Sequence, residues 1–214
     1  MASGSLYNFD YLLKYILIGD NIVGKSALLT RYTQGEFDKN EYDTTIGVEF
    51  GIKKININNK ILKIEIWDCN GSESFLSITR TYYNNSVCAL IVYDISSRNS
   101  FKNITKWING FKTGCPKTCL LILVGNKCDL NDIRQVTEEE GKKLADENDM
   151  MFFETSAKNG FNVHEVFLKS ANEILKKIGE NYYDLNNEAC GIIMGKRKNL
   201  QFYLRKNLLK YIKY

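Results

Sequence analysis

The feature that most constrains the fold is the segment 19–26, GDNIVGKS, which follows an apolar run at 11–18 and precedes a helical pattern from about Lys25. Its spacing fits G-x-x-x-x-G-K-[ST], in which a glycine-rich turn joins a buried strand to a helix. Backbone N–H groups and the helix N-terminus then surround phosphate groups, the lysine neutralises the outer ones, and the serine hydroxyl reaches Mg²⁺. A chance glycine turn would require neither the strand nor the helix. The sequence therefore predicts a phosphate-binding loop made of Asn21, Ile22, Val23, Gly24, Lys25, Ser26 and Ala27.

Apolar, β-branched runs alternate with helical patterns along most of the chain. We predict strands at 11–18, 50–58, 61–67, 87–93, 119–124 and 151–154, and helices from 25 and at 98–113, 137–148 and 163–178. Asn58-Asn59 indicates a hairpin, and Thr137 with Glu140 forms a capping box. Alternating strands and helices are typical of a parallel sheet with helices on both faces. We expect a three-layer α/β domain with a six-stranded, mostly parallel sheet, one antiparallel edge strand and about five helices, and ligands at the carboxyl ends of the strands.

Composition and charge indicate one globular domain followed by a basic tail. The 214-residue chain is 44% hydrophobic and 25% charged, which is ordinary for a chain that buries a core. Its net charge is +4, yet the segment 196–214 alone holds seven Lys or Arg and no acid, so the remaining residues carry −3. We expect an N-terminal extension at 1–10, the domain at 11–180, and a variable C-terminal region at 181–214.

Cysteine and histidine usage gives no metal-binding motif. The six cysteines form no C-x-x-C pair and the chain has one histidine, so a zinc site is poorly supported. Scattered thiols of this kind are typical of reduced, cytoplasmic proteins. No secretion signal precedes the first strand, and no apolar run reaches the roughly 18–20 residues that a membrane span needs. A cytoplasmic protein without a transmembrane segment is expected.

A second group of residues predicts recognition of a guanine base. Two segments, NKCD at 126–129 and TSAK at 155–158, each follow a predicted strand and supply Asn126, Lys127, Asp129, Ser156, Ala157 and Lys158. The carboxylate of Asp129 can accept hydrogen bonds from both the ring N–H and the amino group of guanine. Adenine lacks that pair, and an unsatisfied buried acceptor costs roughly 1–3 kcal/mol. The stem of Lys127 can lie over the base, and the TSAK segment offers a backbone N–H to the guanine carbonyl. An ATP-using enzyme is therefore disfavoured.

The motifs occur in a fixed order: GxxxxGKS, Thr-Ile-Gly at 45–47, Trp-Asp-x-x-Gly at 67–71, NKCD and TSAK. This set resembles the Ras-like small GTPases. Within them it is similar to the Rab subfamily, on the segments IGVEF at 46–50, KIEIWD at 63–68, FLSIT at 75–79, YY at 82–83 and VYDI at 92–95. The resemblance runs from about residue 11 to residue 195. DLNNEACGI at 184–192 resembles the ends of the Rab members numbered two and fourteen, which serve the endoplasmic reticulum, Golgi and early endosome.

The resemblance implies a molecular switch that binds GTP or GDP with Mg²⁺ and hydrolyses GTP. It implies that Ser26, Thr45 and, through water, Asp68 hold the Mg²⁺ ion. The amide of Gly71 would sense the γ-phosphate. Phe37 would lie edge-on to the guanine, and Tyr42 would close over the phosphates.

The resemblance also implies partners and a location. Phe50, Trp67 and Tyr82 fall where Rab proteins expose an apolar effector face, although plain core packing is an equal alternative for Trp67. Effectors, an exchange factor and an activating protein are expected, with no nucleic acid, and the protein is expected to be a monomer. It would lie peripherally on Golgi and endoplasmic reticulum membranes and regulate vesicle-mediated transport.

Three residues depart from the Rab pattern around the terminal phosphate. Ser72 stands where a glutamine usually orients the attacking water, and it is too short to do so directly. Asn70 replaces an alanine beside the γ-phosphate. Ile22 stands where Gly, Ser or Ala is usual, and a β-branched residue is strained if that backbone needs a positive φ. We predict GTP binding with slow intrinsic hydrolysis. The alternatives are a GTP-loaded scaffold that does not cycle, and neutral drift within a working switch.

The tail 196–214, KRKNLQFYLRKNLLKYIKY, also departs from the Rab pattern. It carries no prenylation cysteine, and the last cysteine is Cys190. Leu200, Leu204, Leu208 and Ile212 recur every four residues among Lys and Arg, a pattern typical of a basic helix that lies on anionic membranes or fills a partner's groove. The alternatives are a helix that packs on the domain and an altered C-terminus.

Overall fold

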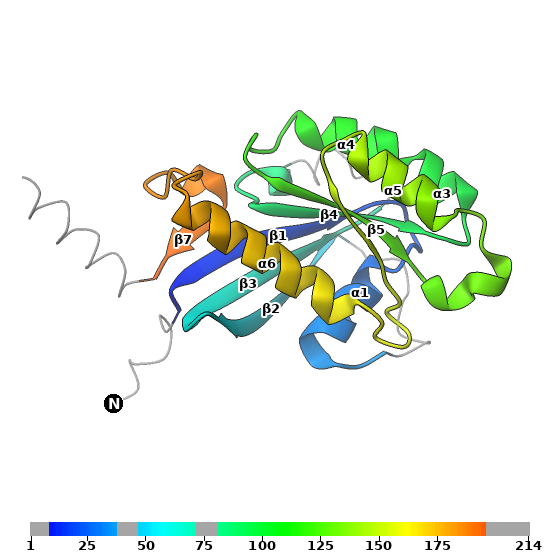
Figure 1. Cartoon of the computed structure of the whole chain (residues 1–214), viewed down its shortest axis with the longest axis horizontal. Coiled ribbons are helices and arrows are strands. Elements are labelled where there is room, and N and C mark those ends of the chain that lie inside the picture. Colours follow the sequence, from blue (N-terminus) through cyan, green and yellow to red (C-terminus); the bar gives the residue numbers. More distant parts are fainter. Residues whose placement is uncertain (1–8, 38–46, 72–80, 196–214) are drawn as a thin grey trace, which may run out of the picture.

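The computed structural model describes residues 9–37, 47–71 and 81–195 of the chain. Its described strands form one sheet in the order β2-β3-β1-β4-β5-β6, and β7 pairs with β1 (Figure 1). The strands are β1 (Tyr11–Ile18), β2 (Val48–Ile57), β3 (Lys60–Cys69), β4 (Cys88–Asp94), β5 (Leu120–Asn126), β6 (Met151–Glu154) and β7 (Ile192–Met194). The α-helices are α1 (Lys25–Gln34), α3 (Arg98–Lys102), α4 (Ile104–Lys112), α5 (Glu138–Asp146) and α6 (Val163–Gly179).

The centre of the sheet is parallel and buried. β1 pairs in parallel with β3 and β4, and β5 pairs in parallel with β4 and β6. All of β4 and the second half of β1 are buried. A strand covered on both faces needs apolar residues on both, which explains the continuous apolar runs that mark β4 and β5 in the sequence. The predicted mostly parallel α/β fold is confirmed.

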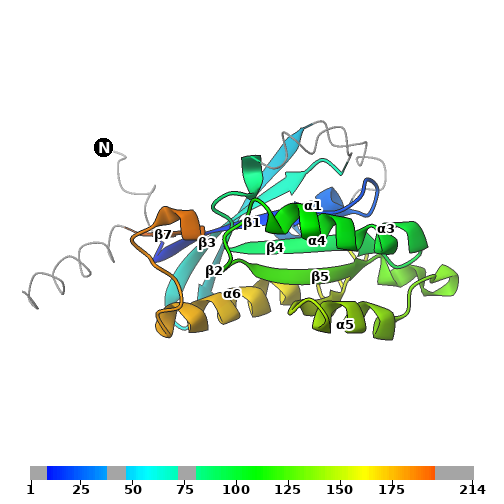
Figure 2. The same ribbon diagram turned by 90° about the horizontal axis from the view of Figure 1, so that it is seen from above.

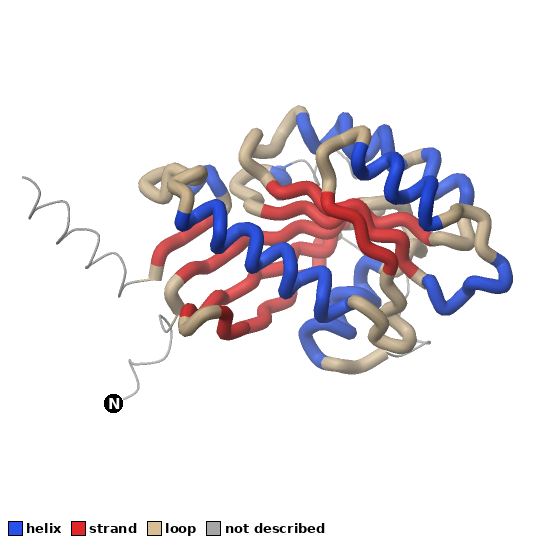
Figure 3. The backbone as a smooth tube through the Cα atoms, in the orientation of Figure 1, coloured by secondary structure: helices blue, strands red, loops and turns tan. Residues whose placement is uncertain are grey.

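Helices cover both faces of this sheet, as Figure 3 shows with the strands in red between the helices in blue. Side chains alternate along β1, so that Leu13 and Tyr15 join one apolar cluster and Ile16 joins the other. α1 and α6 complete the first cluster, with Phe167 of α6 stacked on Tyr32 of α1 at a ring-centroid distance of 3.8 Å. α4 and α5 complete the second cluster. The predicted three layers are therefore present.

The predicted hairpin joins β2 and β3. The two strands are antiparallel from the pair Val48↔Cys69 to the pair Ile57↔Lys60. Asn58 and Asn59 connect them with φ of 50° and 59°. Asparagine tolerates this left-handed conformation better than most residues, so the turn matches the twist of the strands.

The prediction of six strands is wrong, because the described chain has a seventh. β7 is antiparallel to β1, with Leu13↔Ile192 as one of its pairs, and it lies at the opposite end of the molecule from α3 (Figure 2). Ile192 is fully buried. Gly191 before it has φ 81°, and a Cβ at that position would lie 2.3 Å from the backbone nitrogen of Val87. Only glycine permits this close approach. As a result, residues 191–195, which belong to the region 181–214 that was expected to be variable, lie against the sheet.

The remaining helices agree with the sequence except at one point. The capping box of Thr137 and Glu140 is present at the start of α5. The helix predicted at 98–113 is divided at Asn103 into α3 and α4. Among the described helices, none is long and apolar enough to cross a membrane.

Candidate functional site

A cavity of about 310 Å³ lies beyond the carboxyl ends of β1, β3, β5 and β6, the edge at which parallel sheets bind ligands. It brings together predicted residues from five separate segments: Asn21, Ile22, Gly24, Lys25, Ser26, Ala27, Phe37, Gly71, Asn126, Lys127, Asp129, Ala157 and Lys158. Val23 and Ser156 were predicted with them but do not line the cavity. Both residues are buried. The carbonyl of Val23 accepts a hydrogen bond from Asn126, and the hydroxyl of Ser156 donates one to Asp129.

The loop after β1 holds a lysine at its centre. The ammonium of Lys25 donates to the carbonyls of Gly19 at 2.9 Å and Asp20 at 2.7 Å, and the side chain is only 7% exposed. Burial lowers the pKa of Lys25, because a charge is costly away from water. An ammonium has three donors, so one remains for an anion in the cavity. This is the geometry expected of a phosphate-binding loop.

A serine and a buried carboxylate lie together at the end of β3. The hydroxyl of Ser26 donates to Asp68 Oδ2 at 2.5 Å. Burial raises the pKa of Asp68 to about 6, while Lys25 and Ser26 act in the opposite direction. Asp68 Oδ1 is buried and has no hydrogen-bond partner among the described residues. A hydroxyl beside an unsatisfied carboxylate oxygen fits Mg²⁺, which takes one or two protein ligands and completes its shell with water and phosphate.

The opposite end of the cavity is built around Asp129. Its Oδ1 accepts from the hydroxyl of Ser156 at 2.6 Å, and Lys158 Nζ lies 3.7 Å from Oδ2. A carboxylate offers about four lone-pair sites, so this support leaves acceptors for a ligand. Lys127 adopts a left-handed φ of 63°, and its ammonium pairs with Asp94 at 2.8 Å. The side chains of Asp129 and Lys127 are thus both held in place along the cavity wall.

Asn126 joins the two ends of the site. Its Nδ2 donates to the carbonyl of Val23 in the phosphate-binding loop at 2.9 Å. Its Oδ1 accepts from the hydroxyl of Thr155 at 3.1 Å and from the N–H of Ala157 at 3.4 Å. Asn126 is 1% exposed. Its amide therefore ties three loops to one another, a role for which a buried polar group with satisfied hydrogen bonds is suited.

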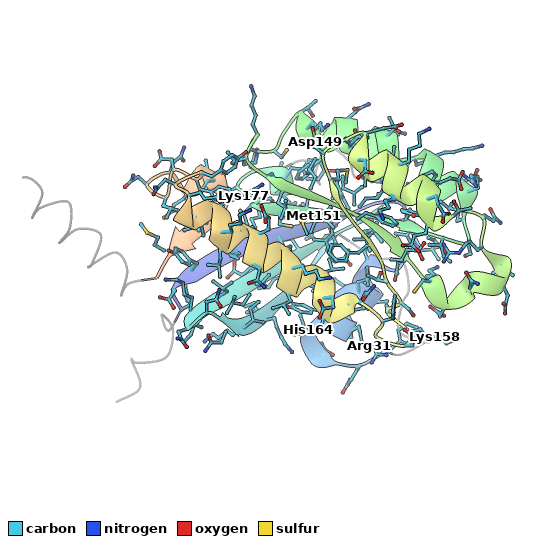
Figure 4. The ribbon with its side chains drawn as sticks, viewed as in Figure 1. Arg31, Asp149, Met151, Lys158, His164 and Lys177 are labelled. Carbon is cyan, nitrogen blue, oxygen red and sulfur yellow. The ribbon has the colours of Figure 1, made fainter. Side chains whose placement is uncertain are left out.

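Sequence reasoning missed several residues that shape the site. Arg31 of α1 donates to the carbonyls of Ala157 at 2.7 Å and Lys158 at 2.6 Å, and its guanidinium lies 5.9 Å from the ring of Phe37. Figure 4 shows Arg31 beside Lys158. Asp94 fixes Lys127, and its position at the carboxyl end of a buried strand was the signal that could have identified it. The contacts of Arg31, which cross the fold, leave no such signal in the sequence.

The residues that depart from the Rab pattern occupy strained or buried positions. Ile22 has φ 66°, and its side chain is 83% exposed. The conditional expectation of strain at this residue is met, because a left-handed backbone is costly for a β-branched side chain. Asn70 is 4% exposed, and its N–H donates to the carbonyl of Gly47 at 3.1 Å. A Cβ on Gly71 would lie 2.5 Å from the backbone nitrogen of Asn21, so this glycine packs directly on the phosphate-binding loop.

The predicted aromatic face forms one cluster. The rings of Phe50 and Trp67 are 4.9 Å apart, and those of Trp67 and Tyr82 are 5.4 Å apart. Phe50 is 46% exposed, while Trp67 and Tyr82 are half-buried. Lys14 donates to the carbonyl of Tyr82 at 2.8 Å and lies 5.4 Å from the ring of Trp67. Trp67 therefore packs on the core and contributes to the surface at the same time.

Some predicted residues lie outside the described ranges. These are Tyr42, Thr45, Ser72 and the tail 196–214.

A parallel sheet with a lysine-bearing phosphate loop after its first strand defines the class of P-loop nucleotide-binding proteins. Residues 14–176 match the model of the Ras family. Because this match spans more than half of the 214 residues, the chain belongs to the Ras family and is a small GTPase.

Proposed function

We propose that the chain is a Rab-type switch that binds GTP or GDP with Mg²⁺ and regulates vesicle-mediated transport of the endoplasmic reticulum–Golgi type. The observation that carries the nucleotide site is that Lys25, Ser26 and Asp129 line one cavity, with Asp68 hydrogen-bonded to Ser26 behind them. Lys25 would neutralise the outer phosphates, Ser26 and Asp68 would hold the ion, and Asp129 would accept from guanine. Bound Mg²⁺ supplies positive charge against the phosphate oxygens.

The catalytic proposal is that hydrolysis is intact but slow. Transfer of the γ-phosphoryl group depends on positioning of the attacking water, and intrinsic turnover in this class is about 10⁻⁴ s⁻¹. Ser72 at the usual glutamine position lacks the reach to hold that water. We expect a loss of a couple of kcal/mol, or a step roughly 10–100-fold slower. The amide of Gly71, which lies against the phosphate-binding loop, would contact the γ-phosphate.

A second candidate function is a scaffold that stays loaded with GTP and recruits effectors without cycling. Two observations favour it: the strained, exposed Ile22 in the phosphate-binding loop and the buried Asn70 beside Gly71. In the proposed site, both residues would lie near the γ-phosphate. The base end and the ion end carry no comparable departure, so nucleotide binding is retained under either proposal.

Single-turnover hydrolysis of bound GTP separates the two candidates. The chain is loaded with GTP and Mg²⁺, and phosphate release is compared between the unmodified protein and Ser72→Gln. Slow release that the glutamine accelerates supports the slow switch. Slow release in both supports the scaffold and assigns the loss to Ile22 and Asn70. Release at the ordinary rate of the class in the unmodified protein would contradict both proposals.

The effector proposal rests on the aromatic cluster. Phe50, Trp67 and Tyr82 form a partly exposed cluster in which Phe50 meets Trp67 edge-on and Tyr82 is tilted against Trp67, and aromatic clusters of this kind are common binding hot spots. Phe50→Ala should weaken GTP-dependent partner binding while the protein stays folded, because the side chain is 46% exposed. Ile133→Ala, an exposed apolar residue elsewhere, is the control, since it is 61% exposed. Equal binding of both variants would exclude this face.

The proposed route to membranes is the basic tail 196–214. Near an anionic surface each of its seven Lys or Arg residues contributes about 1 kcal/mol, enough for reversible attachment. Sedimentation with vesicles containing phosphatidylserine, for the full chain and for a truncation after Gly195, tests it. Equal sedimentation of the two proteins would refute the role of the tail.

A further inference from the structure

The carboxylate of Asp20 in the phosphate-binding loop is held by two side chains of a distant segment. Trp107 Nε1 donates to Asp20 Oδ1 at 2.7 Å, and Asn103 Nδ2 donates to Asp20 Oδ2 at 2.7 Å. Asn103 and Trp107 lie at the start and in the middle of α4, more than 80 residues along the chain. Hydrogen bonds to an ionised carboxylate are stronger than those between neutral groups. The loop is therefore fixed to α4 at this residue.

The backbone of Asp20 supports the phosphate end of the cavity. Its carbonyl accepts the ammonium of Lys25 at 2.7 Å. The position of a Cβ on Gly71 would be 2.4 Å from the Asp20 carbonyl carbon, so the segment after β3 also packs on this residue. A shift of Asp20 would thus move both Lys25 and the loop surface that Gly71 contacts.

The loop is under strain between two fixed points. Ile22, two residues after Asp20, has φ 66°. On its far side the carbonyl of Val23 accepts from Asn126 at 2.9 Å. A residue in a costly backbone region persists only where its surroundings hold it. Asp20 and Val23 are the nearest residues on either side with side-chain hydrogen bonds from other elements.

We propose that Asn103 and Trp107 are positioning residues for phosphate binding, which act through Asp20 to hold the loop and Lys25 in the geometry that retains the nucleotide. The inference rests on the proposed nucleotide site. It assigns these residues no contact with the ligand. Because Asp129 is not involved, the preference for the base should be independent of this contact.

Asn103→Ala is the main test, because the side chain is exposed and does not cap α4. The matched control is Asn109→Ala, another exposed asparagine of the same helix. Release of a fluorescent GDP analogue from the full chain with Mg²⁺ is measured by chase with unlabelled GDP. We expect Asn103→Ala to release it about 10-fold faster, the effect of one lost hydrogen bond to a charged group at the low end of its usual range. Its thermal midpoint should match that of Asn109→Ala.

Asp20→Ala gives a test in which two explanations differ in sign. Removal of a negative charge beside phosphates would by itself slow release, whereas loss of the contact to α4 would speed it. The ratio of GDP to IDP affinity should stay unchanged in both variants, since IDP lacks only the amino group that Asp129 reads. Trp107→Phe is a third variant, and the first two suffice if it does not fold.

Faster release from Asn103→Ala and Asp20→Ala with an unchanged GDP to IDP ratio would support the proposal. Release from Asn103→Ala equal to that from Asn109→Ala, or slower release from Asp20→Ala, would overturn it. Failure of the unmodified chain to bind GDP would instead overturn the nucleotide site itself, so the two failures are distinguishable.

Discussion

Replacement of Ile22 by glycine should stabilise the protein, although it removes a large apolar side chain. Ile22 has φ 66°, and a left-handed backbone costs a non-glycine residue about 1–2 kcal/mol. The side chain is 83% exposed, so little burial is lost. Glycine costs about 0.5–1 kcal/mol through the greater freedom of the unfolded chain. The net expectation is a gain of about 0.5–1 kcal/mol.

For a domain of this size, such a gain corresponds to a rise of about 1–4 °C in the thermal midpoint. Circular dichroism at fixed nucleotide and Mg²⁺ concentrations measures it, because bound ligand also shifts the midpoint. The control is Ile133→Gly. Ile133 is 61% exposed and is not among the described residues with positive φ, so this variant should lower the midpoint. If Ile22→Gly lowers the midpoint as much as the control, the argument from backbone strain is refuted.

Three further predictions concern the base, the loop contact and pH. Asp129→Asn should weaken GDP binding about 10–100-fold and favour xanthine nucleotides, because the amide offers a donor in place of an acceptor. Competition between GDP and XDP measures this preference, and an unchanged preference would exclude Asp129 from recognition of the base. Gly71→Ala should speed nucleotide release in the chase assay, because its Cβ would lie 2.5 Å from the Asn21 nitrogen, and unchanged release would contradict the close contact. The hydrogen bonds from Arg98 lower the pKa of Glu140 to about 2, so its contribution to the free energy of unfolding is present above pH 4.5 and is lost as pH falls towards 2. In denaturant titrations Glu140→Gln should therefore be less stable than the unmodified protein at pH 7 and equal to it near pH 2, and a constant difference would contradict this sign.

The parts of the fold that were predictable depend on local pattern. Tyr11–Ile18 and the start of α1 are where the apolar run and the glycine-rich turn placed them. The hairpin turn at Asn58 and Asn59 was readable because asparagine has few alternatives to a turn between two alternating runs. These structures depend on interactions among residues that are close in the sequence, so local composition and spacing are enough to predict them.

β7 was missed for the opposite reason. Its three residues are too few to show a period, and its partner strand lies about 180 residues earlier in the chain. Only the packing of Gly191 against Val87 and the burial of Ile192 reveal that this segment belongs to the sheet.

The candidate site divides in the same way. The phosphate loop, the guanine motif and Asp68 were readable as motifs. The first two meet in one cavity, and Asp68 is joined to it through Ser26. The supports from Arg31 and Trp107 were not readable, because their contacts cross the fold. Asp94, which pairs with Lys127, left a signal in its position at the carboxyl end of a buried strand. The roles of Tyr42, Thr45 and Ser72 stay predictions.

The short β7 has a mechanical consequence for any load on the chain beyond Gly195. Hydrogen bonds between antiparallel strands run perpendicular to the strands, so a pull along β7 shears them together instead of opening them one at a time. Backbone bonds from Lys14 to Gly191 and from Gly195 to Asp10 share this load with the pairs of the strand. The force then enters the first half of β1, at the end of that strand farthest from the loop that follows it. A tethered molecule would bear tension there before the cavity is disturbed.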